Sequence, residues 1–170
     1  MAGQLRQQLK QRRPFRSIEA EVFLNVLRTS TTFVGQLVEV LRPYELTQPQ
    51  YNVLRILRGA GAAGLPCGEV GERMVSREPD VTRLLDRMEQ RGLVARARDA
   101  ADRRVVTARL TPEGLRLVDA LDEPVEALHA RQLGHLSADE LRTLNMLLES
   151  ARNERSMDGE VDEEMVEAED

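Results

Sequence analysis

Between Arg77 and Gly92 the apolar positions of the chain recur with the period of an α-helix. They lie three, four and seven residues apart, at Val81, Leu84, Leu85 and Met88. Pro79 suits the first turn of such a helix, and Gly92 suits the residue that follows its end. The pattern therefore predicts one amphipathic helix with a single apolar stripe.

The face opposite this stripe is polar and includes Pro79, Thr82, Arg83, Asp86 and Gln90. Threonine, arginine and glutamine side chains can hydrogen-bond to base edges and to phosphates. We therefore interpret the segment as a DNA-reading helix, with a plain solvated face as the alternative. Thr82 and Arg83 are the main candidates for base or phosphate contacts, and Arg77 and Gln90 are further ones. Arg87, nearer the edge of the stripe, is either a phosphate anchor or part of an intramolecular salt bridge.

The residues after this helix alternate with a period of two, which is typical of strands. Two such runs, 93–98 and 105–110, flank a polar loop over 99–104, and the pattern predicts a β-hairpin. A hairpin directly after a recognition helix is a wing. Arg103 and Arg104 near its tip are candidates for the minor groove. Asp102 is expected to orient a neighbouring arginine, because a carboxylate repels phosphate.

The residues before the helix predict the first part of a helix-turn-helix. A short helix over 68–75 and a turn over 76–78 precede it. Further upstream, the sequence from Thr47 to Gln50 predicts a capping box that opens a helix to about Arg58. The glycine and alanine run over 59–64 predicts a loop, followed by a short extended piece over 65–67.

Long helices are predicted on both sides of this central region. Ser17 can cap a helix that runs to about Arg42, and its apolar positions cover more than one side. Such a helix spans nearly 40 Å, more than a small monomeric core needs, which suggests an intersubunit surface. After the hairpin, Thr111 begins a second long helix that Pro124 should bend. A capping box at Ser137 opens the last helix.

The charge is unevenly distributed along the chain. The 170 residues contain 24 basic and 29 acidic side chains, for a net charge of −5. Eight of the acidic residues, and none of the basic ones, fall within 156–170. Without them, 21 acidic residues face 24 basic ones, and a mildly basic body permits DNA binding. We therefore expect a flexible basic leader over 1–16, a single domain over 17–153, and an acidic disordered tail over 154–170. The alternative for the leader is a basic arm that contacts phosphates or packs on a partner subunit.

Several other classes of protein are disfavoured by the sequence. It contains no apolar run long enough for a membrane span and no secretory signal, and its single cysteine, Cys67, fits the reducing cytoplasm. Cys67 is better explained as a small apolar filler than as a redox sensor. His129 and His135 do not make up a metal-ligand set. Neither a phosphate-binding glycine loop nor a nucleophile with its base can be assembled, so we expect no enzyme activity, no metal and no cofactor.

The order of these predicted elements resembles the MarR (multiple antibiotic resistance regulator) family over roughly residues 17–152. Its most specific pieces are LTQPQYNVL at 46–54, VTRLLDRMEQRGLV at 81–94, DRR at 102–104 and LTPEG at 110–114. The implied fold is mainly α with a small β-hairpin wing. It places a winged helix-turn-helix at about 46–111 between dimerisation helices at about 17–42 and 112–152.

The resemblance also implies a function. Members of this family are homodimeric bacterial transcription factors, usually repressors, that bind a pseudopalindromic operator in double-stranded DNA. Small-molecule effectors, often aromatic acids, bind between the dimer interface and the winged helix and loosen DNA binding. The family's wing often reads Asp-x-Arg-Asp, but this chain has Ala101 at the arginine position, so Arg103 or Arg104 would have to serve instead. The alternative function is a winged-helix protein–protein interaction module without operator specificity.

Overall fold

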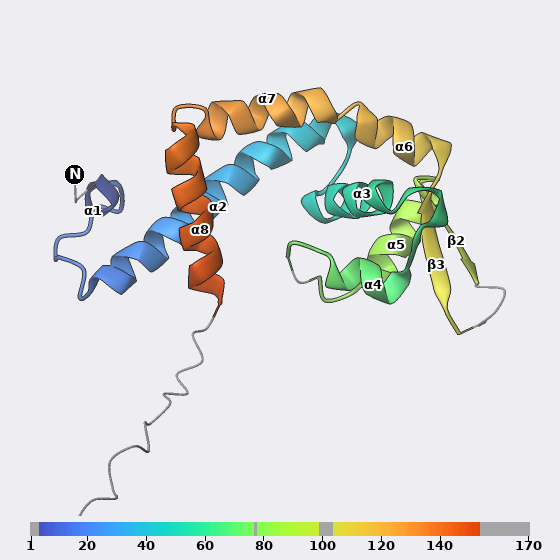
Figure 1. Cartoon of the computed structure of the whole chain (residues 1–170), viewed down its shortest axis with the longest axis horizontal. Coiled ribbons are helices and arrows are strands. Elements are labelled where there is room, and N and C mark those ends of the chain that lie inside the picture. Colours follow the sequence, from blue (N-terminus) through green and yellow to red (C-terminus); the bar gives the residue numbers. More distant parts are fainter. Residues whose placement is uncertain (1–3, 77, 99–103, 154–170) are drawn as a thin grey trace, which may run out of the picture. The chain divides into compact units, whose positions relative to one another are not determined.

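The computed structural model describes residues 4–76, 78–98 and 104–153. These described residues form two compact units, divided between Gln132 and Leu133. The first unit contains a long helix followed by a helical region with a small antiparallel sheet (Figure 1). Its helices are α1 (Gln4–Gln8), α2 (Ile18–Leu41), α3 (Gln48–Ala60), α4 (Cys67–Glu72), α5 (Val81–Gln90), α6 (Pro112–Asp119) and α7 (Asp122–Leu133). Short 3-10 helices η1 (Arg42–Tyr44) and η2 (Gly61–Ala63) follow α2 and α3. The predicted fold class, mainly α with a β-hairpin, is confirmed.

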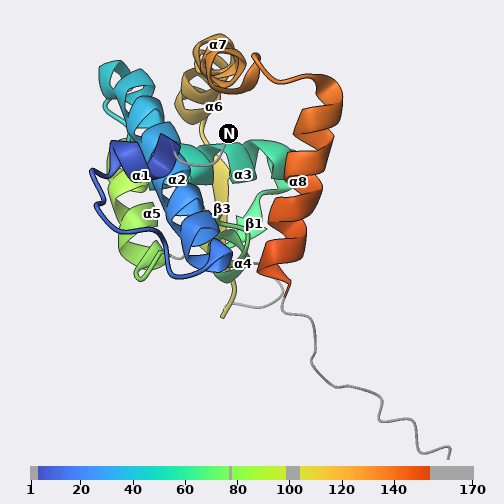
Figure 2. The ribbon, with the colours of Figure 1, turned by 90° about the vertical axis from the view of Figure 1, so that its left-hand side faces the viewer.

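The sheet has three strands in the order β1-β3-β2. The predicted hairpin consists of β2 (Val94–Arg98) and β3 (Val106–Leu110), with Val94 opposite Leu110 and Arg98 opposite Val106. The predicted extended piece is β1 (Leu65–Pro66), and it pairs with the other side of β3. In the second view β1 and β3 lie beside α4, in agreement with their contacts (Figure 2). The hairpin therefore contacts both helices of the helix-turn-helix, α4 beside β1 and β3, and α5 beside β2.

Helix α5 has well-formed ends that the sequence predicted in part. Asp80 caps its beginning, because its side chain accepts the backbone N–H of Arg83. Pro79 lies one residue before this cap, so the prediction that it occupies the first helical turn is wrong. At the other end Gly92 has a φ of 68°, and the N–H of Leu93 bonds to the carbonyl of Met88. This is a Schellman motif, for which glycine is the favoured residue.

The core fixes α5 against its neighbours. Leu84, Leu85 and Met88 are each 2% exposed or less, as the apolar stripe predicted. They belong to one cluster with residues of α3, the hairpin and α6–α7, including Leu54, Leu57, Val94, Val118 and Leu121. Burial of this stripe leaves the opposite face of α5 to the solvent.

Several boundaries differ from the predictions. Helix α4 ends at Glu72 and not at about residue 75. Helix α3 continues to Ala60, and η2 occupies part of the predicted loop. Gly64 ends that segment with a φ of 70°, and a Cβ there would lie 2.3 Å from the carbonyl oxygen of Ala108. The long helix after the hairpin is not bent at Pro124 but divided into α6 and α7 before it. Proline has no N–H to donate to a carbonyl four residues earlier, and the helical pattern is interrupted at 120–121.

The terminal segments were predicted to lack structure. Within the basic leader the structure places α1, with Leu5 only 5% exposed, where no element was expected. The acidic tail over 154–170 lies outside the described residues. Before it, the second unit contains α8 (Ala138–Arg152), which begins with the predicted capping box of Ser137 and Glu140. In the part of the chain that the structure covers, no helix is both long enough and apolar enough to span a membrane.

Candidate nucleic-acid interface

The exposed face of α5 carries four of the predicted DNA-binding residues. Thr82, Arg83, Arg87 and Gln90 are all exposed, and Pro79 is exposed just before the helix. The side chain of Arg83 has 82% of its surface exposed to solvent. Because the opposite face is buried in the core, this polar face is held in one orientation.

The two arginines on this face differ in their contacts. Arg83 forms an ion pair with the cap residue Asp80, with 3.1 Å between Nε and Oδ2. The Nε of Arg87 donates to the carbonyl oxygen of Arg83 at 3.3 Å. Arg87 makes no ion pair with any residue that the structure describes, so the predicted salt-bridge alternative for Arg87 is not observed there. Both guanidinium groups remain accessible to a polyanion.

Arg96 of β2 connects the hairpin to α5, a contact that the sequence analysis did not identify. Its Nη2 lies 2.5 Å from Asp86 Oδ1 and 2.7 Å from Glu89 Oε2. Its Nε donates to Glu89 Oε2 at 3.0 Å, and its backbone N–H donates to Glu89 Oε1 at 2.9 Å. These donors hold the pKa of the Glu89 carboxyl below its ordinary value. Side chains alternate along a strand, so Arg96 shares a side of β2 with the buried Val94, and this was the available signal that it points inward.

The structure describes only part of the predicted wing tip. Arg104 is exposed at the start of the segment that leads into β3, and Arg98 is exposed at the end of β2. Arg77, Asp102 and Arg103, the other predicted DNA-binding residues, lie outside the described residues.

A second ion-pair cluster joins α3 to the helices after the wing. Arg58 of α3 donates from Nη1 to Asp119 at 3.0 Å, and from Nη1 and Nη2 to the two carboxylate oxygens of Asp122, each at 2.8 Å. The guanidinium holds the pKa of Asp122 below its ordinary value. This cluster ties α3 to the end of α6 and the start of α7.

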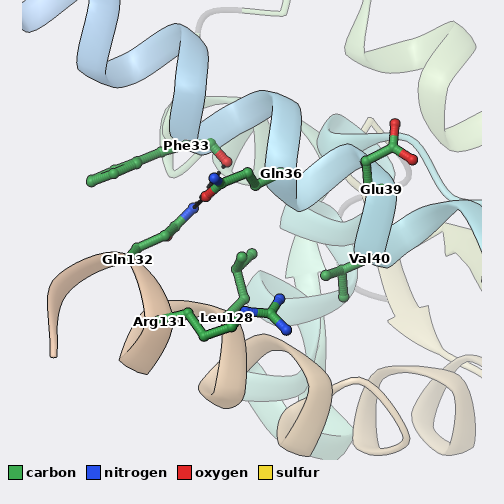
Figure 3. A pocket seen from close by; sticks show the side chains of 7 residues that line it. All are labelled: Phe33, Gln36, Glu39, Val40, Leu128, Arg131 and Gln132. Atoms are coloured by element: carbon green, nitrogen blue, oxygen red, sulfur yellow. Dashed lines mark hydrogen bonds between the residues drawn. The ribbon is translucent and has the colours of Figure 1, made fainter.

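A pocket of about 590 Å³ lies between α2 and α7 (Figure 3). It is lined by Phe33, Gln36, Glu39, Val40, Leu128, Arg131 and Gln132. The amide of Gln132 crosses between the helices, donating to the carbonyl oxygen of Phe33 at 3.3 Å and to Gln36 Oε1 at 2.9 Å. Glu39 is paired with Arg42. The pocket thus combines an apolar surface with the guanidinium of Arg131, which is suited to a small organic anion.

The other residues considered for chemistry were Cys67, as a redox sensor, and His129 and His135, as metal ligands. Cys67 is half-buried, and burial raises the pKa of its thiol, which disfavours the reactive thiolate. No group of three or more histidine, cysteine or carboxylate side chains within the described ranges could hold a metal ion.

Comparison with known proteins places this arrangement in a family. Residues 46–106, which include the helix-turn-helix and most of the wing, match the model of the MarR family. The transcriptional regulator HosA of Escherichia coli is 36% identical over 109 residues, which cover 64% of this chain and 79% of HosA.

Solved structures agree with this match. A MarR transcription factor from Planctomyces limnophilus is 42% identical, with a TM-score of 0.62, over 81% of this chain and 99% of that one. A mutant MarR from E. coli, solved in complex with operator DNA, is 29% identical with a TM-score of 0.69. That alignment covers 75% of this chain and 91% of the E. coli protein.

Proposed function

The chain belongs to the MarR family of transcriptional regulators, and we propose that it acts as a homodimeric repressor of transcription in the cytoplasm. Members of this family regulate transcription by binding DNA and are not enzymes. In the proposed mechanism, two protomers bind one pseudopalindromic operator and release it when a small organic acid binds.

The polar face of α5 is the observation that supports DNA reading. Thr82, Arg83, Arg87 and Gln90 are exposed on one side of a helix whose other side is buried. In a helix-turn-helix the second helix enters the major groove with such a face toward the base edges. The adjacent hairpin, with Arg98 and Arg104 exposed near its tip, would contact the neighbouring minor groove.

Exposed apolar side chains support the homodimer. Helix α2 leaves Ile18, Val22 and Phe23 between 52% and 65% exposed, and α8 leaves Leu147 58% exposed. Apolar surfaces of this kind mark protein–protein contacts. A two-fold symmetric dimer would place the two recognition helices about one helical turn, roughly 10 base pairs, apart on the operator.

The pocket between α2 and α7 supports control by a ligand. Phe33, Val40 and Leu128 offer an apolar surface, and Arg131 offers a guanidinium for a carboxylate (Figure 3). Because α7 connects to the winged helix through α6, a ligand wedged against α7 could change the spacing of the two recognition helices. An aromatic acid has the required combination of an apolar body and an anionic group.

The decisive experiment is binding to the DNA upstream of the protein's own gene. Fluorescence anisotropy with that DNA and with a scrambled duplex, at several salt concentrations, gives both the specificity and the number of phosphates contacted. We expect a clear preference for the upstream DNA and a linear, steep fall of log K with log[salt]. A flat salt dependence, or equal binding to both duplexes, would contradict the repressor assignment and favour the protein–protein module.

A further inference from the structure

The hairpin joins α5 through a short turn. Only Arg91, Gly92 and Leu93 separate the last residue of α5 from the first residue of β2. The Schellman hydrogen bonds at Gly92 and the burial of Leu93 fix the base of the hairpin to the end of α5. For DNA binding, however, a recognition helix and a wing must fit two adjacent grooves at the same time.

Arg96 holds the angle between α5 and the hairpin at a second point. It lies in the middle of β2, and its side chain donates to two carboxylates that are three residues apart on α5, Asp86 and Glu89. Glu89 also accepts the backbone N–H of Arg96, so the strand itself and not only the flexible side chain is attached to the helix. Together with the turn at Gly92, these contacts connect the hairpin to α5 at two separated places.

The same contacts make Arg96 unsuited to bind phosphate. Its side chain is only 20% exposed, and its guanidinium is shared by two carboxylates. Arg98, two residues farther along the same strand, is exposed instead. Strand alternation puts both arginines on one side of β2, so the inner one is bound to α5 while the outer one is available to a ligand.

We propose that Arg96 is a positioning residue that fixes the angle between the recognition helix α5 and the wing, so that both grooves are contacted by one rigid unit. This role rests on the proposed DNA binding but concerns a residue that does not itself touch DNA. It makes operator affinity depend on an internal ion pair, because a wing whose outer part tilts away from α5 loses its groove contacts while the exposed face of α5 is kept. A binding surface made of two separate elements needs supporting contacts that keep those elements at a fixed angle to each other.

The test compares Arg96→Met with Arg116→Met. Methionine keeps much of the apolar length and removes the donors, and Arg116 is an exposed arginine on α6 that pairs with Glu113. We expect Arg96→Met to weaken operator binding about tenfold, the size of a typical coupling between contacting residues. Arg116→Met should change it little. Arg96→Lys, which keeps one donor group but not the fork, should recover part of the affinity.

Footprinting separates positioning from a general loss of stability. With Arg96→Met, hydroxyl-radical protection of the flanking minor groove should disappear, while protection of major-groove guanines from methylation persists. A merely structural effect would remove both protections together, in proportion to the loss of thermal stability. Either that result or an unchanged footprint would overturn the proposal.

A measurement without DNA keeps this proposal separable from the repressor assignment. In the free protein, Arg96→Met should speed amide hydrogen exchange across β2 and leave the amides of α5 protected. Unchanged amide hydrogen exchange in β2 would refute the attachment of β2 to α5 by Arg96, even if the wild-type protein binds the operator. Conversely, faster exchange with no DNA binding by the wild-type protein would support the attachment and count against the proposed function only.

Discussion

Asp80 contacts Arg83 with both of its carboxylate oxygens. Oδ1 accepts the backbone N–H of Arg83 at 2.9 Å, and Oδ2 lies 3.1 Å from the Nε of the same residue. One side chain therefore begins α5 and also pairs with the guanidinium of the arginine that is the main candidate for reading DNA. The two contributions can be separated, because an amide can replace the first contact but not the ion pair.

The first prediction uses that difference. Asp80→Ala removes the cap and should lower the free energy of unfolding by about 1 kcal/mol, seen as a lower melting temperature. Asp80→Asn keeps a good cap and should leave the melting temperature nearly unchanged. The asparagine variant should also bind DNA at least as tightly as the wild type, since a carboxylate next to the phosphates is removed. Weaker binding by Asp80→Asn would show that the ion pair orients Arg83 productively.

The second prediction concerns Arg83 itself. Arg83→Ala should weaken operator binding by about 1–3 kcal/mol if its guanidinium binds a base edge. Anisotropy titrations with operator and random duplexes measure the two affinities, and Arg142→Ala on α8 serves as a control for the loss of an exposed arginine. An equal loss on both duplexes would make Arg83 a phosphate contact without sequence preference.

Local features of the fold could be predicted from the sequence because their signals are local. The caps at Ser17, Thr47, Thr111 and Ser137 each use a side chain and a backbone group only three residues apart. The position of Pro79 was misjudged because proline and aspartate both favour a helix beginning. In the structure the N-cap residue of α5 is Asp80.

The parts of the candidate site that sequence could not reveal depend on distant residues. Arg58 is 61 and 64 residues from its partners Asp119 and Asp122. The partners of Arg96 are nearer, but they become visible only when the hairpin is folded against α5. The face of α5 could be predicted because a helical period alone separates its apolar and polar sides, whereas an ion pair requires the tertiary arrangement.

The third prediction follows from the lowered pKa of Asp122. A carboxyl group with a lower pKa in the folded than in the unfolded protein stabilises the fold above its unfolded pKa, about 3.9. That stabilisation is lost as the pH falls through the folded pKa. Melting temperatures between pH 7 and pH 3 should therefore fall less steeply for Asp122→Asn than for the wild type. Glu123→Gln, at the next residue, should retain the wild-type slope; equal slopes for all three proteins would argue against the ion pair with Arg58.

The fourth prediction tests the pocket between α2 and α7. Arg131→Met should leave operator binding nearly unchanged in the absence of a ligand, because Arg131 lies on α7, away from the exposed face of α5. It should, however, raise the concentration of an aromatic acid needed to release the operator. A screen of small aromatic acids in the anisotropy assay, repeated with Arg131→Met, gives this comparison. If the same concentration of an acid releases the operator from the wild type and from Arg131→Met, that acid binds outside this pocket.

The fifth prediction uses two adjacent residues of α8 as a matched pair. Leu147 lies on the apolar stripe formed with Leu141, Leu144, Leu148 and Ala151, whereas Met146 projects from nearly the opposite side of the helix. Both side chains are similarly exposed in the single chain, at 58% and 60%. If the stripe forms a dimer interface, Leu147→Glu buries a carboxylate there and Met146→Glu does not.

The measurement is the oligomeric state by sedimentation velocity over a range of protein concentrations. We expect the wild type and Met146→Glu to remain dimeric at concentrations where Leu147→Glu is monomeric. The monomeric variant should also lose operator affinity, because one recognition helix then binds without its partner and the gain from two linked half-sites disappears. Equal sedimentation of both variants would exclude the stripe of α8 as the interface. Loss of the dimer in both variants would mean that the interface is wider than the stripe.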